Sequence, residues 1–211
     1  CAILGSMTSI DVRSADLQPI RIGVSSCVIG EEVRWTGGHS RQRYLTDMLG
    51  PFDEYVPVCP EVEVGMGVPR PTVRLVRQGD DIRMVEPKNG VDWTSSMRRL
   101  SLKRSSELAD EGLHGFVLKK DSPTCGVFRV RIYTESGVER NGRGIFADAL
   151  MRRMPHLPVE EEGRLNDAKI RENFVERIFA YRRLRELFRP RWTIGDVVAF
   201  HTREKLLLRA H

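Results

Sequence analysis

The chain has 211 residues, of which 40% are hydrophobic and 30% are charged, and its formal net charge is +5 at pH 7. These values are typical of a globular protein with one large domain or with one domain and part of a second. The sequence has no apolar run long enough to span a bilayer and no secretory leader pattern, so we expect a cytoplasmic protein. Residues 1–6, CAILGS, precede Met7 and are interpreted as a cloning remnant.

Two apolar runs near the amino end predict buried strands, and a cysteine follows each run. Residues 20–25, IRIGVS, lead to Cys27, and residues 55–58 lead to Cys59. Between these strands, residues 41–49 predict a short helix. The order so far is strand, helix, strand.

The middle of the chain predicts a hairpin, a helix and a third strand. Residues 73–76 and 82–85 flank QGDD, which is typical of a hairpin that leaves a main sheet. A helix is expected over residues 94–109. The apolar run at residues 115–118 then leads through a short loop to Cys125. A third cysteine therefore follows a third strand.

A fourth apolar run at residues 127–133 and a helix over about residues 144–153 complete an alternation of strands and helices. This order predicts an α/β fold with a mainly parallel sheet flanked by helices, followed by an all-α C-terminal segment. We expect residues 7–158 to form the first domain. Residues 159–211 are expected to form a linker and the first helices of a truncated helical domain.

Helical periodicity dominates from Asn166 onward, where apolar residues recur at spacings of three and four. A second helix is expected to begin at Thr193 and to continue to the last residue, which suggests truncation. From Arg171 to the last residue, the chain has ten Lys or Arg residues and five acidic residues. The surplus of positive charge therefore lies in this segment.

The three internal cysteines are the candidates for a metal site. Ligands of parallel α/β sheets bind outside the carboxyl ends of the strands, where Cys27, Cys59 and Cys125 are expected. Their separations match no local zinc or ferredoxin spacing, so such a site would be assembled by the fold. Three thiolates would leave one position open, either on zinc or on one iron of a cubane cluster. Plain burial of free cysteines is the alternative.

Three segments resemble the signature segments of the thiouracil desulfidase family, namely SSCVIGEEVRWTGGH, VPVCPEVEVGMGVPRP and LKKDSPTCG. Their order and context match over roughly residues 20–155. The segment RLNDAKIRENFVERIFAYRRLRELF resembles the start of a domain fused to this family in bacterial desulfidases that convert 4-thiouridine in tRNA to uridine. The resemblance implies a desulfidase acting on tRNA. An enzyme for free thiobases and a non-catalytic iron-sulfur sensor or RNA-binding module are the alternatives.

The resemblance also implies a cofactor and roles for the site residues. It implies a [4Fe-4S] cluster held only by Cys27, Cys59 and Cys125, with a fourth iron open to the substrate sulfur in a non-redox hydrolysis. It makes Glu61 the catalytic acid/base, against the alternative of a solvated carboxylate at a strand end. Ser122 is a candidate to hydrogen-bond the base or to relay a proton, and a turn hydroxyl that satisfies local backbone is its alternative.

Phosphate contacts to tRNA are predicted on the basic C-terminal helices. The candidates are Arg182, Arg183, Arg185, Arg189 and Lys205, and a solvated helix face is the alternative. Arg70, which follows Pro69, is a further candidate to pair with an acid near the site. His39 and Arg41 are further candidates for phosphate or substrate contacts, although a plain surface loop accounts for them equally well.

Overall fold

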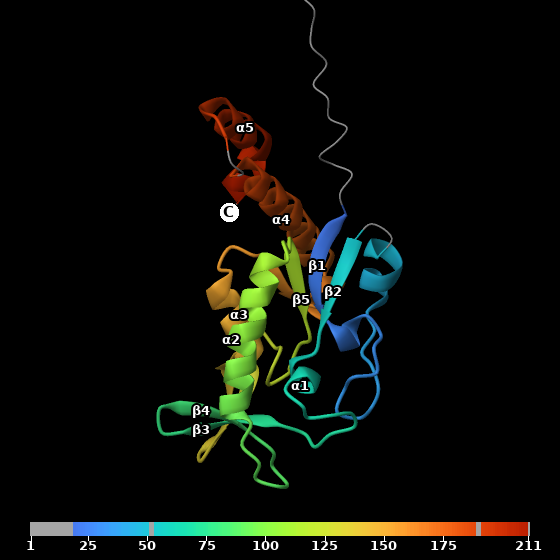
Figure 1. Ribbon diagram of the computed structural model, residues 1–211, viewed down its shortest axis with the longest axis vertical. Coiled ribbons are helices and arrows are strands. Elements are labelled where there is room, and N and C mark those ends of the chain that lie inside the picture. Colours follow the sequence, from blue (N-terminus) through green and yellow to red (C-terminus); the bar gives the residue numbers. More distant parts are fainter. Residues whose placement is uncertain (1–18, 51–52, 189–190, 211) are drawn as a thin grey trace, which may run out of the picture.

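The structure of the chain, a computed structural model, describes residues 19–50, 53–188 and 191–210 (Figure 1). Its first sheet has four strands in the order β2-β1-β5-β8. These strands are β1 (Ile20–Ser25), β2 (Asp53–Val58), β5 (Gly115–Leu118) and β8 (Val159–Glu161). Every neighbouring pair in this sheet is parallel, so the four carboxyl ends lie along one edge. The predicted α/β fold with a parallel sheet is confirmed.

A second sheet lies beyond that edge and has the order β4-β3-β6-β7. Its strands are β3 (Arg74–Gln78), β4 (Asp81–Val85), β6 (Val130–Thr134) and β7 (Gly137–Gly142). The predicted hairpin is confirmed, since β3 and β4 pair antiparallel. The fourth apolar run was expected in the main sheet, and this expectation is wrong. Its strand β6 instead pairs with β3 and buries Val130 and Ile132 against Met84 in a separate core.

The fourth strand of the first sheet is the short acidic strand β8, which begins at the first residue of the expected linker. Val159 pairs with Phe116 of β5, so the sheet continues past residue 158. Glu160 and Glu161 are buried within this strand. The strand was not predicted because three consecutive glutamates close to Pro158 have the composition of a loop.

Helices pack on the first sheet and bury its side chains. Figure 1 shows α2 (Thr94–Asp110) and α3 (Ile145–Arg153) side by side, and both match predicted helices. Four short turns connect other elements: η1 (Ser26–Val28), η2 (Tyr44–Leu49, a π-helical turn), α1 (Pro60–Glu63) and η3 (Arg164–Asn166). Close packing beneath the helices requires Gly23, because a Cβ there would lie 2.2 Å from the Phe116 ring.

Two long helices, α4 (Ala168–Leu187) and α5 (Ile194–Ala210), form the all-α C-terminal segment. The apolar stripe of α4 buries Phe174 and Ile178 against the first sheet, as its periodicity predicts. The end of α4 lies at the amino-terminal edge of the sheet (Figure 1), and Arg185 there donates to the carbonyl of Leu113 just before β5. None of the described helices is long and apolar enough to cross a membrane.

Candidate metal centre and active site

A cavity of about 500 Å³ lies at the carboxyl edge of the first sheet, and all three internal cysteines line it. Cys27 lies in the turn η1 after β1, Cys59 directly follows β2, and Cys125 lies in the loop after β5. The strand ends therefore gather three residues that are far apart in the sequence, as the strand pattern predicts.

The three thiols share a dehydrated environment. Burial raises the pKa of Cys27 to about 11, and it is also the main cause that raises the pKa of Cys59 and, most strongly, of Cys125. The charge of Cys59 raises the pKa of Cys27 further. The charges of Cys27 and Cys59 likewise raise the pKa of Cys125. The nearby Lys119 ammonium opposes these effects at Cys27. The sulfur atoms are therefore close enough to influence one another, and a bound cation would favour their thiolate forms.

This donor set suits a cluster better than a single ion. Within the described part of the chain, no three His, Cys, Asp or Glu side chains meet closely enough to hold one metal ion. In an iron-sulfur cluster, by contrast, each cysteine binds a different iron, so the ligands lie farther apart around a larger cavity. Three thiols around a cavity of about 500 Å³ fit that arrangement. A zinc site with three cysteines is not favoured.

Glu61 lines the same cavity and is held at both carboxylate oxygens. Its Oε2 accepts hydrogen bonds from Nε and Nη2 of Arg70 at 2.8 and 2.6 Å. Its Oε1 accepts a hydrogen bond from the Thr124 hydroxyl at 2.9 Å. The side chains of Arg70 and Glu61 are only 4% and 15% exposed. Glu61 is therefore a positioned carboxylate and not the solvated one of the alternative interpretation.

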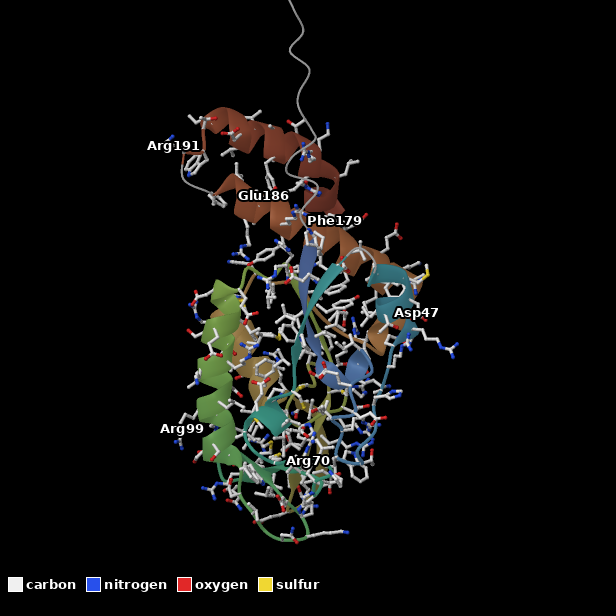
Figure 2. All side chains as sticks on the ribbon, turned by 45° about the vertical axis from the view of Figure 1, so that its right-hand side comes forward. Asp47, Arg70, Arg99, Phe179, Glu186 and Arg191 are labelled. Carbon is white, nitrogen blue, oxygen red and sulfur yellow. The ribbon has the colours of Figure 1, made fainter. Side chains whose placement is uncertain are left out.

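Arg70 is itself fixed by the loop that precedes it. Its Nη1 donates to the Gly67 carbonyl at 3.0 Å, and its backbone N–H donates to the carbonyl of Trp35 at 3.1 Å. The prediction that Arg70 pairs with an acid near the site is confirmed. Figure 2 shows Arg70 on the carboxyl-terminal side of the strands of the first sheet.

Ser122 organises the loop that carries Cys125. Its Oγ accepts hydrogen bonds from the backbone N–H groups of Thr124 and Cys125 at 3.2 and 3.0 Å, and the residue lines the cavity. The hydroxyl thus satisfies local backbone, as the alternative interpretation states. Among the described residues its own proton meets no acceptor, so it retains the ability to donate into the cavity.

Two buried glutamates brace the same loop, and sequence reasoning missed both. Glu161 accepts hydrogen bonds from the backbone N–H groups of Val127 and Phe128 at 2.7 and 3.0 Å. Glu162 pairs with the Lys119 ammonium at 2.5 Å. It also accepts a hydrogen bond from the backbone N–H of Lys120 at 2.7 Å. These carboxylates replace water as partners of the loop backbone, and they fix both ends of the segment that carries Ser122 and Cys125.

The arginines of α4 make internal contacts, which changes their expected role. Arg182 is buried and pairs with Glu186 at 3.1 Å, so the expectation that it offers a solvent-facing phosphate contact is wrong. Arg183 holds α5 to α4 through two hydrogen bonds to the buried Glu204, at 2.5 and 2.9 Å. Arg185 contacts the loop before β5, as described above. These contacts form because α4 packs against the first sheet on one side and against α5 near its carboxyl end.

The remaining candidates lie away from the cavity or outside the structure. Lys205 is exposed on α5, and Arg189 lies outside the described residues. In the loop after β1, the backbone N–H of Arg41 donates to His39 Nδ1, and Arg41 pairs with Asp47 at 2.6 Å. Neither His39 nor Arg41 lines the cavity.

Comparison with known proteins places this arrangement in context. The family model described as 2-thiouracil desulfurase matches residues 22–162. The chain is 27% identical over 149 residues to the uncharacterized protein YbbK of Bacillus subtilis (strain 168), covering 68% of this chain and 97% of that protein. A solved structure of the [4Fe-4S]-dependent thiouracil desulfidase TudS is similar with a TM-score of 0.57 and 30% identity, over 70% of this chain and 93% of that one. The family match includes the three cysteines, Glu61, Ser122 and β8.

Proposed function

This chain belongs to the 2-thiouracil desulfurase family, and we propose that it is an enzyme that removes sulfur from a thiolated pyrimidine in the cavity at the carboxyl edge of the first sheet. One observation carries the proposal: three thiols from three strand ends and a positioned carboxylate line one cavity. A sensor would need the thiols but not the carboxylate. The similarity to a [4Fe-4S]-dependent thiouracil desulfidase supports the same conclusion.

Cys27, Cys59 and Cys125 are the residues that would hold a [4Fe-4S] cluster, because they are the described thiols at the cavity. With three protein ligands, the cluster would supply a Lewis-acidic iron with an open position for a soft thiocarbonyl sulfur. The cationic Lys119, which acts on Cys27, would offset part of the negative charge of the thiolates.

We assign to Glu61 the role of taking a proton from the attacking water. Arg70 donates two hydrogen bonds to Oε2 and Thr124 donates one to Oε1, which orients the carboxylate and leaves a lone pair of Oε1 for the water. Ser122 is the candidate to relay the proton toward the leaving sulfur. In the net reaction the carbon–sulfur bond breaks and a carbon–oxygen bond forms. The two hydrogens of water leave with the sulfur as hydrogen sulfide, so no electron donor is required.

The substrate that we propose is 4-thiouridine in tRNA, which would be converted to uridine. Support comes from the resemblance of the C-terminal helices to the domain fused in tRNA desulfidases, and from the net positive charge of the chain. A thiolated base inside folded tRNA must be exposed or flipped to enter the cavity. Free thiouracil is the second candidate, because the similar solved structure is named for thiouracil.

An anaerobic assay with cluster-reconstituted protein tests these proposals. Thiolated tRNA and free thiouracil are incubated separately, and the loss of thiocarbonyl absorbance is followed. Faster loss with tRNA supports the first substrate, and loss with thiouracil alone supports the second. If neither substrate loses its absorbance while the cluster is intact, the protein is not a desulfidase for these substrates.

A further inference from the structure

The second sheet has one buried face and one open face. Its buried face packs Leu75 and Ile132 against Met97 of α2. Side chains alternate between the two faces along a strand, and directly paired residues share a face. The open face therefore carries the remaining side chains, which are exposed or half-buried: Asp81, Arg83 and Val85 of β4, Arg74, Val76 and Gln78 of β3, Arg131 and Tyr133 of β6, and Val138 and Arg140 of β7. Each strand thus contributes one arginine to this face.

Three of these arginines form a row across the sheet. Arg131 lies directly opposite Arg140 in the register of β6 and β7. β3 runs parallel to β6 with Leu75 beside Ile132, so the preceding residue, Arg74, lies beside Arg131. Neighbouring strands are about 4.8 Å apart, so the three side chains leave the backbone close together. Like charges on directly opposite residues destabilise a sheet, so the row opposes folding.

The charges of this row are not neutralised by the protein. Arg74, Arg131 and Arg140 make no ion pair and no side-chain hydrogen bond with any residue that the structure describes. Asp81, the acid of the open face, is engaged by Arg98 at 2.6 Å. The fold therefore holds three adjacent positive charges together and gives them no acidic partner within the described part of the chain.

Arg74 is fixed in place by an aromatic ring. Its guanidinium carbon lies 4.8 Å from the centre of the Tyr133 ring on the neighbouring strand. Its Nε is buried and has no hydrogen-bond partner among the described residues. The guanidinium is therefore held by a cation–π contact, which leaves its terminal N–H groups free of protein acceptors. A cation that is already fixed loses little conformational freedom when it binds a ligand.

Protection of the sheet edges does not account for the row. Charged side chains on edge strands prevent a sheet from pairing with other chains. β4 and β7 are the edges of this sheet, so that explanation covers Arg83 and Arg140. Arg74 and Arg131 instead lie on the two central strands, β3 and β6. A row that crosses the central strands needs another explanation, and its chemistry favours the binding of an anion.

An extended polyanion fits this row better than a small anion does. Arginine binds phosphate through pairs of N–H groups, and the four cations of the open face are all arginines. The row also begins beside the cavity, because the exposed Arg131 lines it, whereas Arg74 and Arg140 do not. An RNA whose base enters the cavity can therefore extend its backbone across the second sheet.

We propose that the open face of the second sheet, through Arg74, Arg131 and Arg140, binds the sugar–phosphate backbone of an RNA substrate outside the cavity. This inference rests on the proposed desulfidase function and deepens it, because it assigns a surface to the part of the RNA that does not react. The surface differs from the basic C-terminal helices, since α5 and the second sheet lie at opposite ends of the molecule (Figure 1).

The salt dependence of binding tests the surface. Unmodified tRNA, which has no thiocarbonyl, is titrated with cluster-reconstituted protein at several salt concentrations, and binding is followed by fluorescence anisotropy. Arg74→Gln and Arg140→Gln are each expected to weaken binding about fivefold and to reduce the slope of log Kd against log salt by about 0.7–0.9. Arg99→Gln removes the same charge from an exposed position on α2 (Figure 2) and should leave the slope near the wild-type value.

A second measurement separates binding from folding. The arginines of the row repel one another, so the glutamine variants should unfold at the wild-type temperature or above it. Arg140→Lys keeps the charge and is expected to keep most of the salt slope. A lower unfolding temperature in Arg74→Gln and Arg140→Gln, together with an unchanged salt slope, would assign these arginines to the stability of the sheet and overturn the surface.

A polyglutamate peptide decides the class of partner. If the Arg74→Gln/Arg140→Gln double variant loses polyglutamate binding but binds tRNA as the wild type does, the open face binds an acidic protein and the RNA proposal is wrong. Unmodified tRNA cannot be desulfurised, so the titrations do not depend on turnover. Binding through this face without sulfide release from thiolated tRNA would refute the proposed function and retain the surface. An active enzyme whose double variant binds tRNA normally would refute the surface alone.

Discussion

Arg70 and Glu61 form a buried ion pair beside the three cysteines, with 2.6 Å between Arg70 Nη2 and Glu61 Oε2. A buried pair contributes little net stability, because both charges lose their hydration. Its value here is orientation, since the guanidinium and the Thr124 hydroxyl hold the carboxylate from two sides. The pair therefore connects the geometry of the loop after β2 directly to the proposed proton transfer.

Arg70→Lys tests the orientation. Lysine keeps the charge but cannot reproduce the two hydrogen bonds that Nε and Nη2 of the guanidinium donate to Oε2, so the carboxylate is held less firmly. We expect kcat to fall about tenfold to a hundredfold with KM and cluster absorbance unchanged. Arg99→Lys is the control for the substitution itself, because Arg99 is exposed on α2 and lies away from the cavity (Figure 2). A variant with wild-type kcat would show that Arg70 does not position Glu61.

Glu61→Gln tests the role of the carboxylate. The amide is close in shape to the carboxylate and can still accept a hydrogen bond from Thr124, but it is a far weaker base. We expect kcat to fall by roughly 10²–10⁴ while the brown cluster absorbance is retained. Wild-type turnover by this variant would remove Glu61 from the proton transfer.

Substitution of each cysteine tests the ligand set. Cys27→Ala, Cys59→Ala and Cys125→Ala are each expected to abolish the cluster absorbance and to lower iron from about four atoms per chain. Cys1→Ala is the control, because Cys1 is outside the described residues and was interpreted as a cloning remnant. Retention of full iron content by any of the first three variants would contradict three-cysteine ligation.

His114 gives the fold a pH dependence that is independent of the cavity. Its Nδ1 accepts a hydrogen bond from the Arg21 backbone at 3.0 Å. Burial, and then the charges of Arg182 and Arg185, lower its pKa from 6.5 to about 4. The unfolded chain takes up this proton near pH 6.5 and the folded chain does not, so stability is full above pH 6.5 and falls toward pH 4. Denaturant titrations should show a smaller fall in His114→Asn than in the wild type. Identical pH profiles would contradict this assignment.

Arg183→Gln tests the revised role of the α4 arginines. Without the guanidinium, the carboxylate of Glu204, which is 4% exposed, loses its partner. We expect the free energy of unfolding to fall by roughly 2 kcal/mol, while KM for thiolated tRNA stays unchanged. Chemical denaturation and steady-state kinetics measure the two effects. A raised KM with wild-type stability would restore Arg183 to the RNA-binding surface.

The sequence predicts the strands that carry the cysteines because their apolar runs are short, buried and ended by turn residues. β1 and β5 have the predicted bounds, since IRIGVS and GFVL are mostly apolar and lie in the core. The position of β6 was predicted wrongly for a physical reason. Its apolar side chains fit either sheet, and the partner β3 is fixed by tertiary packing that periodicity does not record.

The polar framework of the site was less predictable than its cysteines. Glu161 and Glu162 lie in an acidic run whose solvation cannot be judged until the loop N–H groups they bind are known. Similarly, Arg182 and Arg183 share a helix with several exposed charges, and only the packing of α4 and α5 shows which of them are enclosed. Ion pairs between distant segments leave no periodic signal in a sequence, whereas a cysteine that follows a predicted strand can be recognised from the strand pattern.

The oxygen that replaces sulfur in the product distinguishes hydrolysis from other routes of sulfur removal. Cluster-reconstituted protein is incubated anaerobically with thiolated tRNA in ¹⁸O-labelled water, without a reductant, and the nucleosides are analysed by mass spectrometry while sulfide is quantified. We predict uridine that carries ¹⁸O and an equal amount of released sulfide, with neither formed by Cys59→Ala. Uridine without the label, or sulfide release that depends on an added reductant, would contradict a hydrolysis at this cavity.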